Sequence, residues 1–547
     1  MPPPLPDSMF IEPVTPTEVL NIANKLKSKS SYGHDNISSK LLKETILYII
    51  KPITHTINRS FDTGIVPSAL KVAKVIPIYK TADKTLLKNY RPISLLPAFS
   101  KLIEKLMYNK LTSFFNSKTL FYKHQYGFRA KHSTVHPIIH LLNHCAESIS
   151  KTTPEMTLAI FCDLSKAFDV ISHDILLNKL RTYGIRGIVH KWFENYLTNR
   201  TQYVELDGQK STSTNITIGV PQGSILGPLL YLIYVNDIGN SCTSNILSFA
   251  DDTTIYLSDH NPVQLYHKAN TQINLLFEWF CANRLSLNAS KTNYIVIKPP
   301  HIRPDLNAYN IFIKDTKLSR LGNECEYKCA KFLGIYIDEN LTWKDHVSNI
   351  NKKKSKALFS IKQLKNVLPA DCLNILYNSL IHSHLSYGII AWGSATKSTL
   401  KQTINLQKRA IRIAHKTNFN SHTDPLFRSS RVMKLTDLYE YSSTIFMHDY
   451  MSHNLPISFN NTFSKNSEAP NSRTTRQSEH LFVARCPTQF ASKLPLFTFP
   501  KLYNKWLQLD AFKGSRSHAK RQISNTIFSS YLSQVKCTNK RCIDCQK

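Results

Sequence analysis

Two adjacent carboxylates, Asp251 and Asp252, are the strongest candidates for chemistry in this 547-residue chain. Apolar residues 245–249 precede them and β-branched and aromatic residues 253–256 follow, so we expect the acids at a hairpin turn between two strands. The two charges repel each other unless a cation neutralises them, and Mg²⁺ prefers carboxylate and phosphate oxygens as ligands. For this pair alone, an acidic turn without a function is the simpler interpretation, because aspartate is common in turns.

A third acid, Asp163, directly follows an apolar strand that we predict over residues 158–162. A carboxylate at the end of a buried strand is unfavourable unless a cation or hydrogen bonds compensate its charge. If Asp163 lies beside the Asp251–Asp252 turn, the three acids can hold two divalent ions about 3.5–4 Å apart, an arrangement that serves phosphoryl transfer.

Basic and glycine-rich segments elsewhere could bind the substrate of such a site. A β-branched run predicts a strand that ends at Lys80, and Arg91 follows after a polar loop. If these cations flank a pocket they can bind a triphosphate, although both are equally consistent with ordinary surface charges. Residues 219–224, which include Gln222 and Gly223, predict either a turn that approaches a substrate closely or a simple helix entry.

Three further segments have less specific patterns. Residues 125–129 interleave aromatic side chains with an arginine, which suits either a nucleic-acid strand or internal packing. Four histidines recur at every fourth position: His132, His136, His140 and His144. A zinc site is conceivable there, but no complete ligand set accompanies them, and we favour a polar helix face. Residues 279–290 predict a helix that ends just before Lys291.

The chain is strongly basic, with 69 Lys and Arg against 37 Asp and Glu and a formal net charge of +32. This excess favours a polyanionic partner, and nucleic acid is preferred to a membrane because no apolar run is long enough to span a bilayer. A hydrophobic content of 42% is typical of a globular chain, and this length allows several domains. The first residues contain no secretory signal, and the 11 cysteines, mostly scattered, fit an intracellular protein.

The last third of the chain is predicted to be helical and basic. Lysines at residues 352–356 can follow a phosphate backbone or simply face solvent. The residues after 400 carry nearly half of the excess positive charge. Three cysteines near the C-terminus would form a zinc site only with a fourth ligand that the sequence does not reveal: Cys537, Cys542 and Cys545.

The ordered set of motifs resembles the reverse transcriptases of non-LTR, LINE-type retrotransposons, and is most similar to jockey-like elements. The motifs are F-C-D at 161–163, A-F-D at 167–169, P-Q-G-S at 221–224, F-A-D-D at 249–252, Lys291, and F-L-G at 332–334. Upstream, Y-R-P-I-S at 90–94 and Y-G-F-R at 126–129 resemble motifs of the same family. The resemblance covers about residues 15–415.

This resemblance implies an α+β right-hand polymerase fold with fingers, a palm built on an antiparallel sheet with helices, and a helical thumb. The expected regions are an N-terminal tail (1–14), a fingers-rich region (15–157), a palm-rich catalytic region (158–340), a helical thumb region (341–415) and a basic C-terminal extension (416–547). The segment before Thr15 is too short for the endonuclease that precedes the polymerase in jockey-like elements.

The resemblance also implies an RNA-directed DNA polymerase that uses two Mg²⁺ ions, with Mn²⁺ as a substitute. The implied ligands of the ions are Asp163, Asp251, Asp252 and the backbone carbonyl of Leu164. The resemblance implies that Lys80 and Arg91 contact the triphosphate and that Phe168 crowds the sugar 2′ position. It further implies that Gln222 and Gly223 place the nucleotide and the template, and that Lys291 protonates the pyrophosphate.

The implied partners are an RNA template, a DNA primer or target, and deoxynucleoside triphosphates, with no membrane and an oligomeric state that the sequence leaves open. The expected location is intracellular, in the nucleus and cytoplasm as a ribonucleoprotein. Two alternatives stay open: a catalytically silent nucleic-acid-binding remnant with a polymerase fold, and a group II intron maturase, which would add a splicing domain. The three intact acids favour an active polymerase over the silent remnant.

Overall fold

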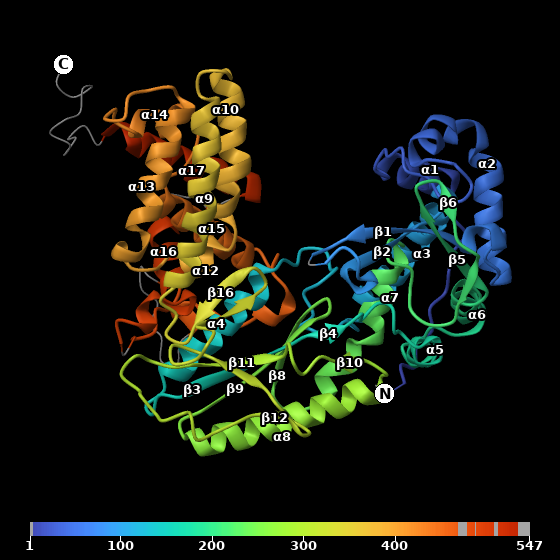
Figure 1. The fold of residues 1–547 in the computed structure, drawn as a ribbon, viewed down its shortest axis with the longest axis horizontal. Coiled ribbons are helices and arrows are strands. Elements are labelled where there is room, and N and C mark those ends of the chain that lie inside the picture. Colours follow the sequence, from blue (N-terminus) through green and yellow to red (C-terminus); the bar gives the residue numbers. More distant parts are fainter. Residues whose placement is uncertain are drawn as a thin grey trace.

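The computed structural model describes residues 4–81, 83–468, 478–486, 488–507, 512 and 514–533. It has three parts: a small sheet with helices near the N-terminus, a larger central sheet, and a bundle of helices from residue 344 onward (Figure 1). This mixture of helix and sheet agrees with the predicted α+β class. Cys537, Cys542 and Cys545 lie outside the described residues.

The N-terminal part joins a helical layer to a sheet made from distant segments. Helices α1 (Pro16–Lys25) and α2 (Ser39–Thr63) pack together, and the Thr15 hydroxyl caps α1. The sheet runs in the order β2 (Tyr90–Leu95), β1 (Val72–Tyr79), β5 (Arg200–Leu206) and β6 (Gln209–Lys210), with β7 (Thr214–Ile216) also paired to β5. Because β1 and β5 pair in parallel, residues 200–216 belong spatially with the N-terminal strands.

The central sheet has the strand order β14, β11, β3, β9, β8. Its strands are β3 (Met156–Cys162), β8 (Asn245–Phe249), β9 (Asp252–Asp259), β11 (Asn293–Ile297) and β14 (Ser319–Leu321). β3 lies in the middle, is buried at almost every position and pairs antiparallel with both β9 and β11. The predicted apolar strand and the predicted hairpin are therefore confirmed, and both belong to one sheet.

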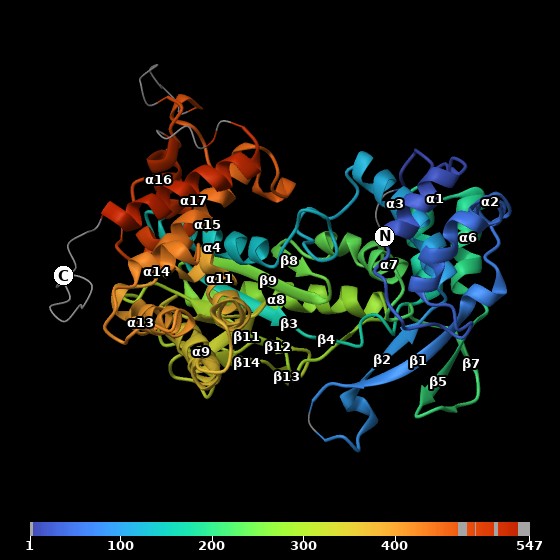
Figure 2. The ribbon, with the colours of Figure 1, turned by 90° about the horizontal axis from the view of Figure 1, so that it is seen from above.

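Helices cover both faces of the central sheet. Along β3, Leu158 and Ile160 belong to the hydrophobic core that includes α8 (Pro262–Ala282), whereas Ala159 belongs to the core that includes α4 (Val135–Ile149). Figure 2 shows these strands between the N-terminal helices on one side and the C-terminal bundle on the other. A sheet covered in this way holds its strand ends in fixed positions.

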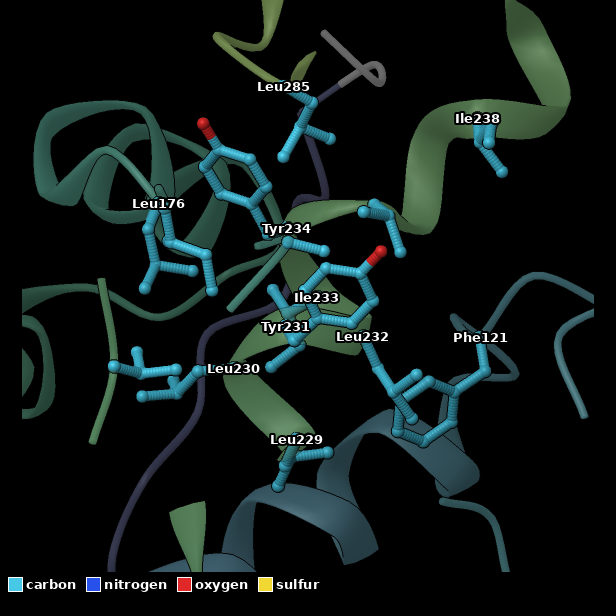
Figure 3. Close-up of a cluster of buried hydrophobic side chains, with 14 of the residues drawn as sticks. Phe121, Leu176, Leu229, Leu230, Tyr231, Leu232, Ile233, Tyr234, Ile238 and Leu285 are labelled. Atoms are coloured by element: carbon cyan, nitrogen blue, oxygen red, sulfur yellow. The ribbon is translucent and has the colours of Figure 1, made fainter. Parts of the chain in front are cut away.

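Helix α7 (Leu226–Tyr234) connects the N-terminal part to the central sheet. It is almost entirely apolar, and all of its residues except Pro228 are buried. Figure 3 shows residues 229–234 clustered with Phe121, Leu176, Ile238 and Leu285. Helices α3 (Ala98–Ser117) and α5 (His173–Thr182) pack against α7, and α6 (Gly187–Leu197) packs against α5. The P-Q-G-S turn therefore leads into a rigidly packed helix.

The predicted helix over residues 279–290 is wrong in its second part. α8 ends at Ala282, where Arg284 adopts a φ of 52° and the Leu285 N–H donates to the Phe280 carbonyl at 2.9 Å. The next residues form β10 (Ser286–Leu287), which pairs with β4 (Leu164–Ser165) immediately after Asp163. This pairing brings the chain that carries Lys291 to the acids.

The C-terminal bundle begins with α9 (Lys344–Leu364) and contains α10 (Ala370–Tyr377), α11 (Ser383–Ser386), α12 (Ile389–Trp392), α13 (Lys397–Ala414), α14 (Asp424–Ser429), α15 (Leu435–Met451), α16 (Pro495–Leu507) and α17 (Arg516–Ser533). Small hairpins precede it: β12 (Phe312–Ile313) with β13 (Thr316–Lys317), and β15 (Cys329–Phe332) with β16 (Ile335–Asp338). None of the described helices combines the length and apolarity that a bilayer crossing requires.

The basic run on α9 is not uniformly solvent-facing. Lys352, Lys353 and Lys356 are exposed, but Lys354 is buried against α13, with its Nζ 3.4 Å from the Thr403 carbonyl. Burial lowers the pKa of Lys354 to about 7. Only part of this run can therefore contact a phosphate backbone.

The regularly spaced histidines are buried or half-buried rather than on an open polar face, which corrects our expectation. His136 is buried against the Phe459 ring, at a centroid distance of 5.7 Å, and His144 hydrogen-bonds the Ser258 hydroxyl at 2.9 Å. Burial lowers the pKa of His132, His136, His140 and His144 to about 4 each. They are therefore uncharged packing residues at neutral pH.

Candidate active site

The three acids lie at one end of the central sheet. Asp163 follows the last residue of β3, Cys162, which pairs with Thr253 on β9. Asp252 precedes Thr253 on β9, so Asp163 and Asp252 stand at neighbouring strand ends. Asp251 occupies the turn between β8 and β9. The register of the sheet therefore brings together acids that are far apart in the sequence.

The negative charges at this end of the sheet affect one another. The pKa of Asp252 is raised to about 6, first because surrounding protein removes part of its hydration and then because Asp251 and Asp163 repel its charge. The Asp252 side chain nevertheless remains open to solvent, so a ligand can reach it. The Lys291 Nζ lies 3.8 Å from Asp163 Oδ2, but both side chains are substantially exposed and the ion pair is weak.

The donor set fits a hard divalent cation. Three carboxylates offer only oxygen, which Mg²⁺ and Mn²⁺ accept, and a cation among them would relieve the repulsion that raises the pKa of Asp252. Within the described part of the chain, no three His, Cys, Asp or Glu side chains form a complete metal-binding group. Leu164, the expected carbonyl ligand, follows Asp163 on β4.

A buried glutamine holds the acidic turn. Ala250, the residue before Asp251, adopts a left-handed φ of 57°. Gln125 Oε1 accepts hydrogen bonds from the N–H groups of Ala250 at 3.0 Å and Gly127 at 2.8 Å, and Gln125 Nε2 donates to the Ala250 carbonyl at 3.4 Å. Gly127 approaches so closely that an added Cβ would lie 2.1 Å from the Ala250 nitrogen. Gln125 and Gly127 thus fix the backbone from which Asp251 extends.

The rest of this segment mainly serves internal packing. The Tyr126 N–H donates to the Ser248 carbonyl on β8 at 2.8 Å, and the Tyr126 side chain is buried. The Arg129 guanidinium donates to the backbone carbonyl of Gln125 at 3.2 Å. Phe128 alone among these aromatics presents a largely exposed ring. The sequence left nucleic-acid contact and packing open for residues 125–129, and packing accounts for most of them.

Phe168 lies near the acids on the loop after β4. Its ring centroid is 4.6 Å from that of Tyr231 on α7. The pKa of the Tyr231 hydroxyl is raised by burial and then by the charges of Asp251 and Asp252, so this ring lies within electrostatic range of both acids. Phe168 is therefore packed on a buried tyrosine whose hydroxyl interacts electrostatically with Asp251 and Asp252.

The Gln222–Gly223 turn connects the loop of Phe168 to the N-terminal sheet. Gln222 Nε2 donates to Asp169 Oδ1 at 2.7 Å, and the Gln222 carbonyl accepts from the Ser94 N–H on β2 at 2.7 Å. Gly223 has a φ of 128°, and a Cβ there would lie 2.5 Å from the Ser94 carbonyl oxygen. The close approach of backbone that we predicted here is thus to β2 of the protein itself.

Lys80 and Arg91 lie on the hairpin of β1 and β2. The Lys80 N–H donates to the Asn89 carbonyl at 2.8 Å, and Arg91 pairs with Ile78 across the two strands. Both cationic side chains are exposed. The structure therefore groups Asp163, Asp251, Asp252 and Lys291, and links Phe168 to Gln222, but it leaves the two cations on a solvent-facing hairpin.

Glu104 is a supporting residue that the sequence did not reveal. This acid on α3 is fully buried and accepts hydrogen bonds from the Ile225 N–H at 2.7 Å and the Tyr196 hydroxyl at 3.0 Å. Burial raises its pKa. Glu104 thereby anchors the chain between the P-Q-G-S turn and α7. The available signal was a lone acid among the apolar residues of a helix, which must find partners when it is buried.

Comparison with known proteins identifies the arrangement. A family model described as reverse transcriptase (RNA-dependent DNA polymerase) matches residues 78–337. Residues 78–337 therefore resemble a reverse transcriptase domain. The domain contains every site residue that we predicted, from Lys80 to Lys291, as well as the supporting residues Glu104 and Gln125.

The reverse transcriptase domain has named relatives in mobile elements. The chain is 27% identical over 443 residues to "RNA-directed DNA polymerase from mobile element jockey" of Drosophila melanogaster, which covers 79% of this chain and 47% of that protein. It is 27% identical over 429 residues to "Probable RNA-directed DNA polymerase from transposon BS" of the same organism, covering 75% and 45%. The chain spans about half the length of these curated relatives. The predicted resemblance to jockey-like polymerases is confirmed.

Proposed function

We propose that this chain is an RNA-directed DNA polymerase that copies an RNA template into DNA as part of retrotransposon replication. The observation that carries the proposal is the meeting of Asp163 with the Asp251–Asp252 turn at one end of a sheet inside a reverse transcriptase domain. The relatives named as RNA-directed DNA polymerases support the same activity.

In the proposed reaction, the 3′ oxygen of a DNA primer attacks the α-phosphorus of a deoxynucleoside triphosphate, and pyrophosphate leaves. Asp163, Asp251 and Asp252, with the carbonyl of Leu164, would hold two divalent ions, Mg²⁺ or, as a substitute, Mn²⁺. When bound, such ions activate the attacking oxygen and neutralise charge on the leaving group. The raised pKa of Asp252, caused first by loss of hydration and then by repulsion from Asp251 and Asp163, supports this assignment, because a cation there would stabilise the ionised carboxylates.

The remaining residues handle the nucleotide. Lys80 and Arg91 contact the triphosphate from the exposed hairpin, where arginine can bind two phosphate oxygens at once. Phe168 crowds the sugar 2′ position, and Gln222 and Gly223 place the nucleotide and the template. Lys291, whose Nζ lies near Asp163, donates a proton to the departing pyrophosphate.

We assign the three parts of the molecule to the regions of a right-hand polymerase. The N-terminal sheet and its helices form the fingers (mainly 15–157, joined by 200–216), the central sheet forms the palm (within 158–340), and α9 to α13 form most of the thumb (341–415). The described part of the N-terminal tail (1–14) contacts the end of α5, where the Leu5 N–H donates to the Thr182 carbonyl at 2.9 Å. The basic extension (416–547) contacts the nucleic-acid backbone.

Primer extension on an RNA template with Mg²⁺ tests the proposal. We expect the wild type to extend a DNA primer and Asp251→Ala to lose on the order of a thousandfold in rate, because removing an ion ligand forfeits several kcal/mol of charge stabilisation. Binding of the RNA–DNA duplex should change little. Asp315→Ala is the matched control, because Asp315 also occupies a hairpin turn but is exposed between β12 and β13.

A wild-type protein that binds the duplex yet never extends the primer would contradict the proposal. That result would identify the chain as the catalytically silent nucleic-acid-binding remnant. Equal activity of Asp251→Ala and Asp315→Ala would show that extension comes from another site or from a contaminating enzyme.

A further inference from the structure

We propose that Phe128 is a specificity-determining residue that holds the Phe168 ring in place and so sharpens the choice between deoxyribose and ribose. This inference rests on the proposed function, in which Phe168 faces the sugar of the incoming nucleotide. It adds an outer support for that ring, supplied by a segment more than thirty residues away in the sequence.

Phe168 is packed between two aromatic rings of different character. Tyr231 lies 4.6 Å away between ring centroids and is fully buried on α7, so its position is fixed by the core. Phe128 lies 6.0 Å away with an interplanar angle of 81°, an edge-to-face contact of the kind that aromatic pairs prefer. Because 48% of Phe128 is exposed, it stands on the solvent side of Phe168. Among the described ring contacts of Phe168, only these two rings are present. Without Phe128, the Phe168 ring would therefore have an aromatic neighbour on its buried side alone.

The backbone of Phe128 is held relative to the acidic turn. Its neighbour Gly127 is pressed against Ala250, and the next residue, Arg129, donates to the carbonyl of Gln125 at 3.2 Å. Phe128 itself has a φ of 53°, a conformation that a bulky residue rarely adopts. A large apolar side chain that is both strained in its backbone and exposed is unfavourable for folding alone, so a role at the site explains it.

These contacts couple two properties of the enzyme. Gln125 and Gly127 set the position of Asp251, and Phe128, from the same segment, sets the position of Phe168. The distance between the reacting phosphorus and the sugar-facing ring is therefore controlled by one short stretch of chain. Loss of the Phe128 ring would let Phe168 move toward solvent and leave room for a 2′ hydroxyl.

The test compares Phe128→Ala with the wild type in single-nucleotide incorporation of matched deoxy- and ribonucleotides. We expect the preference for the deoxynucleotide to fall about threefold to tenfold, the range that one aromatic pair contributes. Phe128→Tyr should keep the wild-type preference because it keeps the ring. Phe312→Ala is the matched control, since Phe312 is 40% exposed on the β12–β13 hairpin against α8.

The same preference can be measured without chemistry, as the ratio of nucleotide dissociation constants for a complex with a dideoxy-terminated primer. If Phe168→Val loses discrimination while Phe128→Ala keeps the wild-type ratio, the role of Phe128 is refuted and the proposed function stands. If Phe128→Ala slows deoxynucleotide incorporation without altering the ratio, Phe128 supports the acids only and the inference is wrong. A wild type that neither extends the primer nor distinguishes the sugars in binding would overturn both proposals.

Discussion

The acidic turn and the β1–β2 hairpin carry complementary halves of the proposed chemistry, but they are built differently. The turn joins strands of a sheet covered on both faces, and Gln125 binds its backbone from a third segment. The hairpin presents Lys80 and Arg91 to solvent, together with the almost fully exposed Leu87. Folding therefore fixes the acids proposed to act on phosphorus, whereas the two cations proposed to bind the triphosphate keep the freedom of surface side chains.

Gln125→Ala should have the largest effect among changes that spare the acids themselves. It leaves the N–H groups of Ala250 and Gly127 without their acceptor and lets the Asp251 backbone shift. We expect the extension rate to fall roughly a hundredfold, the loss that a displacement of about 1 Å produces at a reacting centre. Primer extension at several Mg²⁺ concentrations measures this loss, and the half-saturating Mg²⁺ concentration should rise.

Gln125→Glu provides the control, because it keeps an oxygen acceptor for both N–H groups. Its activity should lie between that of the alanine variant and that of the wild type. Identical Mg²⁺ dependence in all three proteins would mean that Gln125 contributes to stability alone, and the acidic turn would then need no support from residues 124–127.

Arg91→Ala should have an intermediate effect that appears in substrate binding. An exposed arginine that contacts a triphosphate contributes about 1.5–3 kcal/mol through charge-assisted hydrogen bonds, so KM for the nucleotide should rise roughly tenfold or more with a smaller change in kcat. Steady-state kinetics with varied nucleotide measures both values. Lys88→Ala, an exposed cation between the same two strands, should leave KM near the wild-type value. If the two variants have equal KM values, the hairpin contributes only general charge.

Asp252→Asn should have a small effect on folding, a gain in stability of the metal-free protein. The pKa of Asp252 is about 6 when folded and near 3.9 in an unfolded chain, so the ionised group destabilises the fold above pH 6. The expected gain is about 1 kcal/mol at pH 7.5, reduced because the side chain is open to solvent. Thermal unfolding without divalent ions measures it, and the gain should disappear as the pH falls toward 4.

Asp83→Asn on the hairpin side should act in the opposite direction. Hydrogen bonds from the Thr85 N–H and hydroxyl lower the pKa of Asp83, so its ionised form is favoured in the folded state. Its replacement should lower the stability slightly at pH 7.5. The stability gain of Asp252→Asn should be absent at pH 4 and should be reduced by Mg²⁺. If either expectation fails, the two carboxylates do not contribute to stability in opposite directions for the reason given.

The sequence predicted those parts of the fold that follow from a local residue pattern. β3 and the acidic hairpin follow from short runs of buried or alternating residues, and the acids were identified from residue type and position. A local residue pattern does not indicate which other strand a strand pairs with. Residues 286–287 continue a helical composition but pair with β4, and β5 joins β1 across more than a hundred residues. Such choices depend on contacts between distant segments.

The same limit applies within the site. Gln125 and Glu104 act through backbone N–H groups of segments far along the chain, and no spacing rule connects them to those partners. Lys354 belongs to a run of lysines that the composition could not divide into buried and exposed members. Side chains that carry the chemistry were therefore easier to predict from the sequence than those that hold them in place.

If the proposed function holds, the contact between Gly127 and Ala250 also bears on how mutated copies of retrotransposon polymerases can be judged. Backbone, rather than a movable side chain, lies 2.1 Å from where a Cβ at residue 127 would stand, so nothing nearby can rotate away to make room. A copy with a larger residue at 127 would display an intact acidic triad and still be inactive. Surveys of degenerate genomic copies that count only the aspartates would overestimate the number of working polymerases, and this glycine provides an independent criterion.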